Sequence, residues 1–143
     1  MLDDPIRSVM QRKKLLMAAP EILVDRAAKL MAAKNVGAIL VVDDNLLVGI
    51  FTERDLLARV VAQGLDAHVT PLSDVMTRSP QTIDPDKPFG CALLVMYEKG
   101  FRHLPVVESG KPIGIVSSRS ALDPELEEFA VEVSRRERYG QIR

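Results

Sequence analysis

An internal repeat constrains the fold of this chain more strongly than any other feature. Residues 36–57 (VGAILVVDDNLLVGIFTERDLL) align without a gap on residues 101–122 (FRHLPVVESGKPIGIVSSRSAL), at a constant offset of 65 residues. The offset slips by one only near the start of each half, where residues 9–10 match residues 75–76. A repeat of this length predicts two copies of one supersecondary unit that pack together and bury a shared core.

The two halves share one order of predicted elements. In the first half, hydrophobic periodicity predicts a short strand at residues 15–18, a helix at 24–33 and a hairpin of strands at 38–42 and 47–51. The second half predicts a strand at 81–83, a helix at 88–99 and a hairpin at 102–116. A further helix begins at Thr52 and at Ser117. The fold class that follows is α+β, with two pseudo-symmetric β-α-β-β-α repeats in one compact module.

The repeat also sets the expected domain boundaries. Repeat 1 covers residues 5–61 and repeat 2 covers residues 72–122, joined by a linker at 62–71 that shows little periodicity. Residues 123–143 predict an extra C-terminal helix and tail with one apolar stripe. That stripe fits either a solvated helix packed on the body or a helix that forms a dimer.

The composition excludes several classes of protein. A net charge of −1 over 143 residues argues against a nucleic-acid-binding protein with a broad basic surface. No apolar run approaches the roughly 18 residues that a membrane span needs, and the N-terminus lacks a signal-peptide pattern, so we expect no membrane association and a cytoplasmic protein. The single cysteine, Cys91, excludes an intramolecular disulfide, and its place in an apolar helical pattern predicts a buried thiol.

The usual catalytic motifs are missing from the sequence. Its two histidines are His68, in the linker, and His103. No HExxH, GxSxG, P-loop or Rossmann glycine pattern is present, and no paired carboxylates suggest acid–base catalysis. We therefore expect a protein that is not an enzyme and that has no metal site and no obligatory cofactor.

The first candidate binding segment runs from Gly49 to Asp55. A glycine within a strand allows a ligand or a neighbouring chain to approach the backbone closely. The strand then ends at a helix N-terminus, where free N–H groups and the helix dipole favour an anion. Thr52 offers a hydroxyl there, and Asp55 can accept hydrogen bonds from a diol such as a ribose. The same T-x-x-D pattern is also typical of a capping box, and the two interpretations are compatible.

The second candidate segment is the pair Arg102-His103. It stands at the start of an otherwise apolar strand, where the first half has Gly37 and Ala38. An arginine beside a histidine close to a helix N-terminus suits a phosphate group. The alternative is an Arg102 that is solvated at the strand end and a His103 that is hydrogen-bonded to the backbone.

In order and in duplicate, these segments resemble a tandem pair of CBS domains, the unit often called a Bateman module. The resemblance rests on the V-M opening of each half (residues 9–10 and 75–76), the A-x-x-x-M helix (27–31), the R-H-L-P-V-V strand (102–107) and the G-h-h-T-x-x-D segment (49–55). It covers roughly residues 5–122. It implies two halves packed through their sheets, with two clefts that bind adenosine compounds: AMP, ADP or ATP, and in some members S-adenosylmethionine or NAD.

The resemblance also implies which residues would bind the ligand. Thr52 and Asp55 would hold phosphate and ribose, Arg102 and His103 would contact phosphate, and the strand at 81–83 would line the base. The full set expected in this cleft is Ile50, Thr52, Arg54, Asp55, Gln81, Thr82, Ile83, Arg102, His103 and Pro105.

The second cleft departs from the family pattern. Its candidate residues are Ala18, Ser117 and Ser120, and Ser120 stands where the ribose-binding acid belongs. Gly37 and Ala38 stand where the cations belong. We therefore expect one competent cleft, while the other is empty or binds something else.

The resemblance implies a function as a stand-alone regulatory subunit. Binding of an adenine nucleotide would change its shape or its partner surface, through differential affinity for two states. We expect a twofold homodimer and a regulated protein that the sequence does not name. The alternative is a ligand-free dimeric scaffold in which the cleft is vestigial.

Overall fold

Two β-hairpins form the centre of the structure, a computed structural model that describes residues 2–12, 15–118, 132–133 and 135–136. In the first half β2 (Ala38–Asp43) pairs antiparallel with β3 (Leu46–Thr52), and in the second half β5 (His103–Glu108) pairs with β6 (Lys111–Ser117). Both hairpins shift register at the same place, between Val41 and Val42 and between Val106 and Val107. The two predicted hairpins are therefore confirmed, including their internal symmetry.

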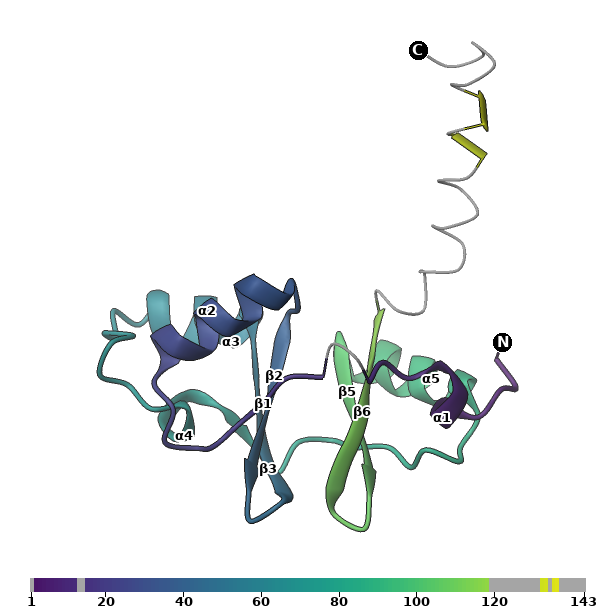
Figure 1. Cartoon of the computed structure of the whole chain (residues 1–143), viewed down its shortest axis with the longest axis horizontal. Helices are drawn as coiled ribbons and strands as arrows, with labels where there is room; N and C mark the ends of the chain where they lie inside the picture. Colours follow the sequence, from purple (N-terminus) through teal and green to yellow (C-terminus); the bar gives the residue numbers. More distant parts are fainter. Residues whose placement is uncertain (1, 13–14, 119–131, 134, 137–143) are drawn as a thin grey trace.

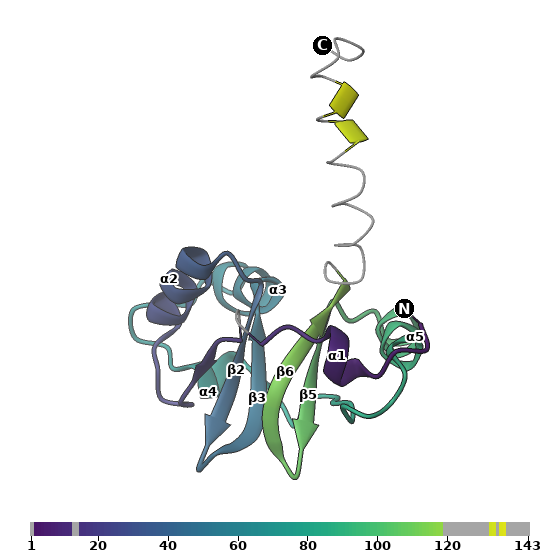
Figure 2. The ribbon, with the colours of Figure 1, turned by 45° about the vertical axis from the view of Figure 1, so that its right-hand side comes forward.

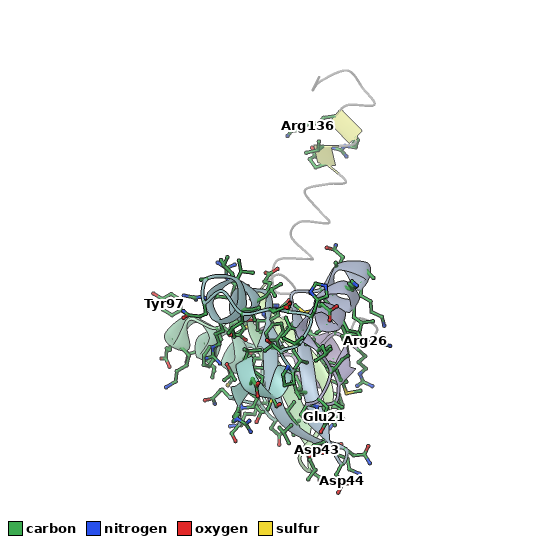
Figure 3. The ribbon with its side chains drawn as sticks, turned by 90° about the vertical axis from the view of Figure 1, so that its left-hand side faces the viewer. Glu21, Arg26, Asp43, Asp44, Tyr97 and Arg136 are labelled. Atoms are coloured by element: carbon green, nitrogen blue, oxygen red, sulfur yellow. The ribbon has the colours of Figure 1, made fainter. Side chains whose placement is uncertain are left out.

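The turns of the two hairpins use residues that tolerate a left-handed backbone. Asp44 and Asn45 have φ angles of 52° and 64°, and Ser109 and Gly110 have φ angles of 53° and 77°. Short polar side chains and glycine adopt such angles at low cost, and two successive positive φ angles match the twist of paired strands. Asp43 and Asp44 lie at the tip of the first hairpin (Figure 3).

One long helix covers the outer face of each hairpin (Figure 1). In α2 (Val24–Lys34) the buried residues are Val24, Ala27 and Met31, and in α5 (Phe89–Lys99) they are Phe89, Ala92 and Met96. These triplets are 65 residues apart, and their spacing places each on one helix face. Cys91 lies off that face and is exposed, so the predicted buried thiol is wrong.

The short leading segment of each repeat packs on the other repeat (Figures 1 and 2). Helix α1 (Ile6–Val9) lies on the second half, and Ile6 N–H donates to the carbonyl of Lys87 at 2.9 Å. Helix α4 (Leu72–Val75) lies on the first half, and Leu72 N–H donates to the carbonyl of Ile22 at 2.9 Å. The two repeats are thereby intertwined.

The sheets extend across the repeat boundary in the same way. Strand β4 (Thr77–Arg78), which follows α4, pairs antiparallel with β3 and completes the order β1-β2-β3-β4. Its counterpart Gln11, which follows α1, makes a single antiparallel bridge to Ile115 of β6.

The parallel strand predicted at the start of each half forms fully only once. Strand β1 (Met17–Ala18) pairs with β2, and Leu40 N–H donates to the carbonyl of Leu16 at 2.8 Å. Residue 105 occupies the equivalent of Leu40, and Pro105 has no N–H to donate. The strand predicted at 81–83 is therefore wrong for residues 81–82. Only Ile83 pairs, through one parallel bridge to Val106.

Three apolar clusters result, arranged as helix on sheet, sheet on sheet and sheet on helix (Figure 2). Residues alternate along each strand between an outer cluster and the central one, so that Ile39 and Val41 face the helices while Ala38 and Leu40 join Ile115 of the other sheet. Both faces of β2 are covered, which explains its continuous apolar run. Within the described ranges, no helix combines the length and apolarity needed to cross a bilayer.

The last predicted helices fall mostly outside the described residues. Helix α3 (Glu53–Asp55) continues directly into a π-helical turn, η1 (Leu56–Val61), and confirms the helix predicted from Thr52. The helix predicted from Ser117 lies beyond the described residues after Ser118. Of the tail at 123–143, the structure describes only residues 132–133 and 135–136, which are helical.

Candidate ligand-binding cleft

A cavity of about 280 Å³ lies between the two halves. The first half contributes the end of β3 and α3, and the second half contributes β4, the loop at 80–81, the end of α5 and the start of β5. The lining residues are Ile50, Thr52, Glu53, Arg54, Asp55, Thr77, Pro80, Gln81, Lys99, Gly100, Phe101, Arg102, His103 and Pro105. Segments about 50 residues apart therefore meet at one hollow.

Most of the residues expected in one cleft line this cavity. They are Ile50, Thr52, Arg54, Asp55, Gln81, Arg102, His103 and Pro105. Thr82 and Ile83 do not line it. Thr82 is exposed, and Ile83 is buried in the core of the second half because its bridge to Val106 directs it under α5. Of this segment, Gln81 alone lines the cavity.

Thr52 and Asp55 form a reciprocal capping box at the start of α3. Asp55 N–H donates to Thr52 Oγ1 at 3.2 Å, and Thr52 N–H donates to Asp55 Oδ2 at 3.0 Å. The cap satisfies two backbone donors that the helix end would otherwise leave unpaired. The threonine hydroxyl accepts in this arrangement and keeps its own proton to donate.

Arg59, which the sequence analysis missed, supports Asp55 from the next helical turn. Its Nε lies 3.6 Å from Asp55 Oδ1. Its Nη1 donates to the carbonyls of Val75 and Met76, at 3.2 and 3.0 Å. The i,i+4 spacing from Asp55 to Arg59 was the available signal. Arg59 therefore links the acidic residue of the cleft to the segment that leads into β4.

His103 is half-buried at the start of β5, and its burial disfavours the protonated form of the ring. Burial lowers the pKa of His103 below its ordinary value of 6.5, the positive charge of Arg102 lowers it further, and the carboxylate of Glu53 opposes both effects. The desolvation of the ring is not visible in the sequence, which predicted only that an arginine beside a histidine suits a phosphate. Arg102 beside it is exposed and charged.

The cavity also contains charged residues that the sequence analysis did not assign to it. Lys99 ends α5, and Glu53 begins α3. With Arg54, Arg102 and Asp55, the lining carries three fixed cations and two carboxylates. Lys99 is the last residue of the helix predicted at 88–99, and its place beside the cleft depends on the packing of that helix.

Gly49 does not face the cavity, and its close neighbour is protein. A Cβ atom built on Gly49 would overlap the side chain of Met76, and one built on Gly114 would overlap that of Met10. Each methionine belongs to the leading segment of the other repeat. The glycine in each of these two β-strands therefore accommodates a methionine side chain of the other repeat.

The candidate residues of the second cleft are only partly described. Ala18 ends β1 and packs against the core of the first half, and Ser117 ends β6, paired with His103. Ser120 lies outside the described residues. Among the described residues, no group of three or more His, Cys, Asp or Glu side chains could hold a metal ion.

Comparison with known proteins identifies the class to which this fold and cleft belong. The model of the CBS domain family matches residues 6–62 and 72–124. The chain therefore belongs to the CBS domain family, and its two halves are two CBS domains.

Relatives and solved structures agree with this assignment. The Meiotically up-regulated gene 70 protein of Schizosaccharomyces pombe is 44% identical over an alignment of 119 residues, and the match covers 76% of this chain but only 16% of that protein. A crystal structure of an uncharacterized conserved protein from Pyrococcus horikoshii matches with a TM-score of 0.81 and 33% identity, over 87% of this chain and 94% of that one. CBSX2, solved in complex with AMP, matches with a TM-score of 0.73 and 30% identity, over 86% of this chain and 96% of that one.

Proposed function

We propose that the cleft binds an adenine nucleotide and that the chain is a non-catalytic regulatory module. One observation carries the proposal: Thr52 and Asp55 of the first half and Arg102 and His103 of the second half line a single cavity. They supply a hydroxyl, a carboxylate that can accept from a diol, a cationic guanidinium and an imidazole, which are groups that suit a nucleoside phosphate. The similarity to CBSX2, a protein solved with AMP, supports the choice of ligand class.

The arrangement suggests a role for each part of the lining. Asp55 would accept hydrogen bonds from the ribose diol, and Thr52 would donate to a phosphate oxygen. Arg102 would neutralise the phosphate, and Lys99 stands at the same side of the cavity. Ile50 and Pro105 are buried apolar residues that would contact the base.

The charge of the lining favours a short phosphate chain. Three fixed cations face two carboxylates, so the net charge available to a ligand is small. Asp55 is engaged by ribose in this proposal, and Glu53 would repel a long polyphosphate. We therefore rank AMP ahead of ADP and ATP, and keep S-adenosylmethionine and NAD as comparison ligands.

Regulation and assembly form the rest of the proposal. Nucleotide binding would stabilise one relative position of the two halves, because the cleft is built from both, and a partner protein would read that change. A homodimer would present two such clefts in twofold symmetry. The proposal also places the protein in the cytoplasm.

Isothermal titration of the whole chain with AMP, ADP, ATP, S-adenosylmethionine and NAD tests this function. We expect AMP to bind, and Asp55→Asn to weaken binding by about tenfold or more while its cap to Thr52 is retained. The matched control is Asp74→Asn, an exposed acid in the first turn of α4, which should bind as the wild type does. If no adenosine compound binds, the nucleotide proposal is wrong and the scaffold alternative takes its place.

A further inference from the structure

Gly37 lies close to the side chains of two residues that line the cleft, His103 and Glu53. A Cβ atom built on it would stand 3.1 Å from His103 Nε2 and 3.1 Å from Glu53 Oε1. Contacts this short are tighter than most Cβ contacts in proteins, so a methyl group at this position would require His103 and Glu53 to shift by a few tenths of an ångström. The backbone holds this geometry, because Glu53 N–H donates to the carbonyl of Gly37 at 2.9 Å.

The internal repeat provides a counterpart of the group formed by Gly37, Glu53 and His103, and the sizes of its side chains are exchanged. Arg102 is the counterpart of Gly37, and Ser118 N–H donates to its carbonyl at the same 2.9 Å. Ala38 is the counterpart of His103, and Ser118 is the counterpart of Glu53. One group therefore combines glycine with two large neighbours, and the other combines arginine with two small ones.

We propose that Gly37 is a positioning residue that confines nucleotide binding to one of the two clefts. Its missing side chain gives His103 and Glu53 their places in the lining of the cavity. An arginine at position 37, as the other repeat carries, would need the volume that these two residues occupy. The inference deepens the proposed nucleotide-binding function and rests on it for the ligand.

Gly37 is related to both clefts. From the sequence alone, Gly37 is the position at which the second cleft lacks the cation that Arg102 supplies to the first. The distances show that the same glycine helps to build the first cleft, because His103 reaches across from the other repeat to meet it. An arginine at position 37 in the second cleft and the side chains of His103 and Glu53 in the first cleft therefore compete for space.

Thermal unfolding without ligand tests the competition for space. We expect Gly37→Arg to lower the melting temperature of the wild type, and to lower that of the Glu53→Ser/His103→Ala double variant much less. The control Ala33→Arg, on the exposed side of α2, should cost the same in both backgrounds. An equal loss for Gly37→Arg in both backgrounds overturns the proposal, whether or not the protein binds a nucleotide.

AMP titration tests the positioning role with a smaller change. We expect Gly37→Ala to fold and to bind AMP about tenfold more weakly than the wild type. It should also shift the imidazole NMR resonances of His103, which are assigned by comparison with His68→Gln. Unchanged affinity and unchanged resonances overturn the proposal. If the wild type itself does not bind AMP, the proposed function fails, and the unfolding experiment still decides whether Gly37 makes room for His103 and Glu53.

Discussion

Thr52 and Asp55 hold each other before any ligand arrives. Asp55 Oδ2 accepts from the backbone of Thr52, and Oδ1 faces Arg59. A ribose diol can therefore replace the weaker contact, 3.6 Å long, and leave the cap in place. The residues proposed to bind nucleotide are thus already fixed in position, which reduces the entropy lost on binding.

The cap makes a measurable contribution to stability. We expect Thr52→Ala to lower the free energy of unfolding by about 1 kcal/mol, because Asp55 N–H loses its acceptor. Thr52→Ser should retain most of it, because the serine hydroxyl can accept the same bond. Urea unfolding monitored by circular dichroism measures both, and equal stability of the alanine variant would show that the cap bond is not formed in solution.

His103 predicts a specific dependence of stability on pH. Its pKa in the folded state is lower than 6.5, so the unfolded chain takes up a proton first as the pH falls. The contribution of His103 to stability is therefore complete above about pH 6.5 and is lost as the pH falls toward the folded pKa. We expect the melting temperature of the wild type to drop more steeply than that of His103→Gln between about pH 7.5 and 5.5. Parallel pH profiles would contradict the assignment.

The residue scale also shows what a single sequence can and cannot predict about this site. The T-x-x-D pattern predicted the capping box, because a cap is a local structure. The lowered pKa of His103 was not predictable, since its largest cause is burial of the ring, which depends on residues distant in sequence. Thr82 was misplaced because a proline at the partner position prevents the strand from extending.

At the scale of elements, the leading segment of each repeat packs against the hairpin of the other repeat. The contact between Met76 and Gly49 recurs between Met10 and Gly114. The V-M opening and the strand glycine of each half are therefore two parts of one contact. Hairpins and long helices were predictable from periodicity, while this pairing across the repeats required the three-dimensional structure.

The methionine–glycine contact should be sensitive to a single methyl group. We expect Gly49→Ala to lower the free energy of unfolding by about 1–3 kcal/mol, because the new Cβ overlaps the Met76 side chain. Combining it with Met76→Ala should remove this overlap, so that the two losses are not additive. Calorimetry on the single and double variants gives the coupling, and strict additivity would indicate that the two residues do not touch.

At the scale of the whole molecule, the exchange of leading helices ties the stability of each half to the other repeat. Ile6 and Leu72 are fully buried counterparts, and each lies in the core of the half to which it does not belong by sequence. Away from these cores, Tyr97 is 86% exposed on α5 and points into solvent (Figure 3). The interior is therefore shared, while the outer helix faces remain separate surfaces.

Amide hydrogen exchange can measure how far each hairpin depends on the leading helix of the other repeat. We expect Ile6→Ala to increase amide exchange in β5 and β6 more than in β2 and β3, because it opens a cavity in the second core. Leu72→Ala should do the opposite. If both variants accelerate exchange in their own repeat instead, the leading helices are not exchanged in solution.

The exchanged helices carry a consequence for how such a chain can change in evolution. A gene segment that encodes one repeat would deliver a sheet without the helix and edge strand that cover it, and a helix without the sheet that it covers. Recombination can therefore transfer the pair of repeats as a folded unit. A single repeat would need a second copy to cover its sheet and its leading helix. The pair of repeats, and not the single repeat, is therefore the unit that recombination can transfer intact.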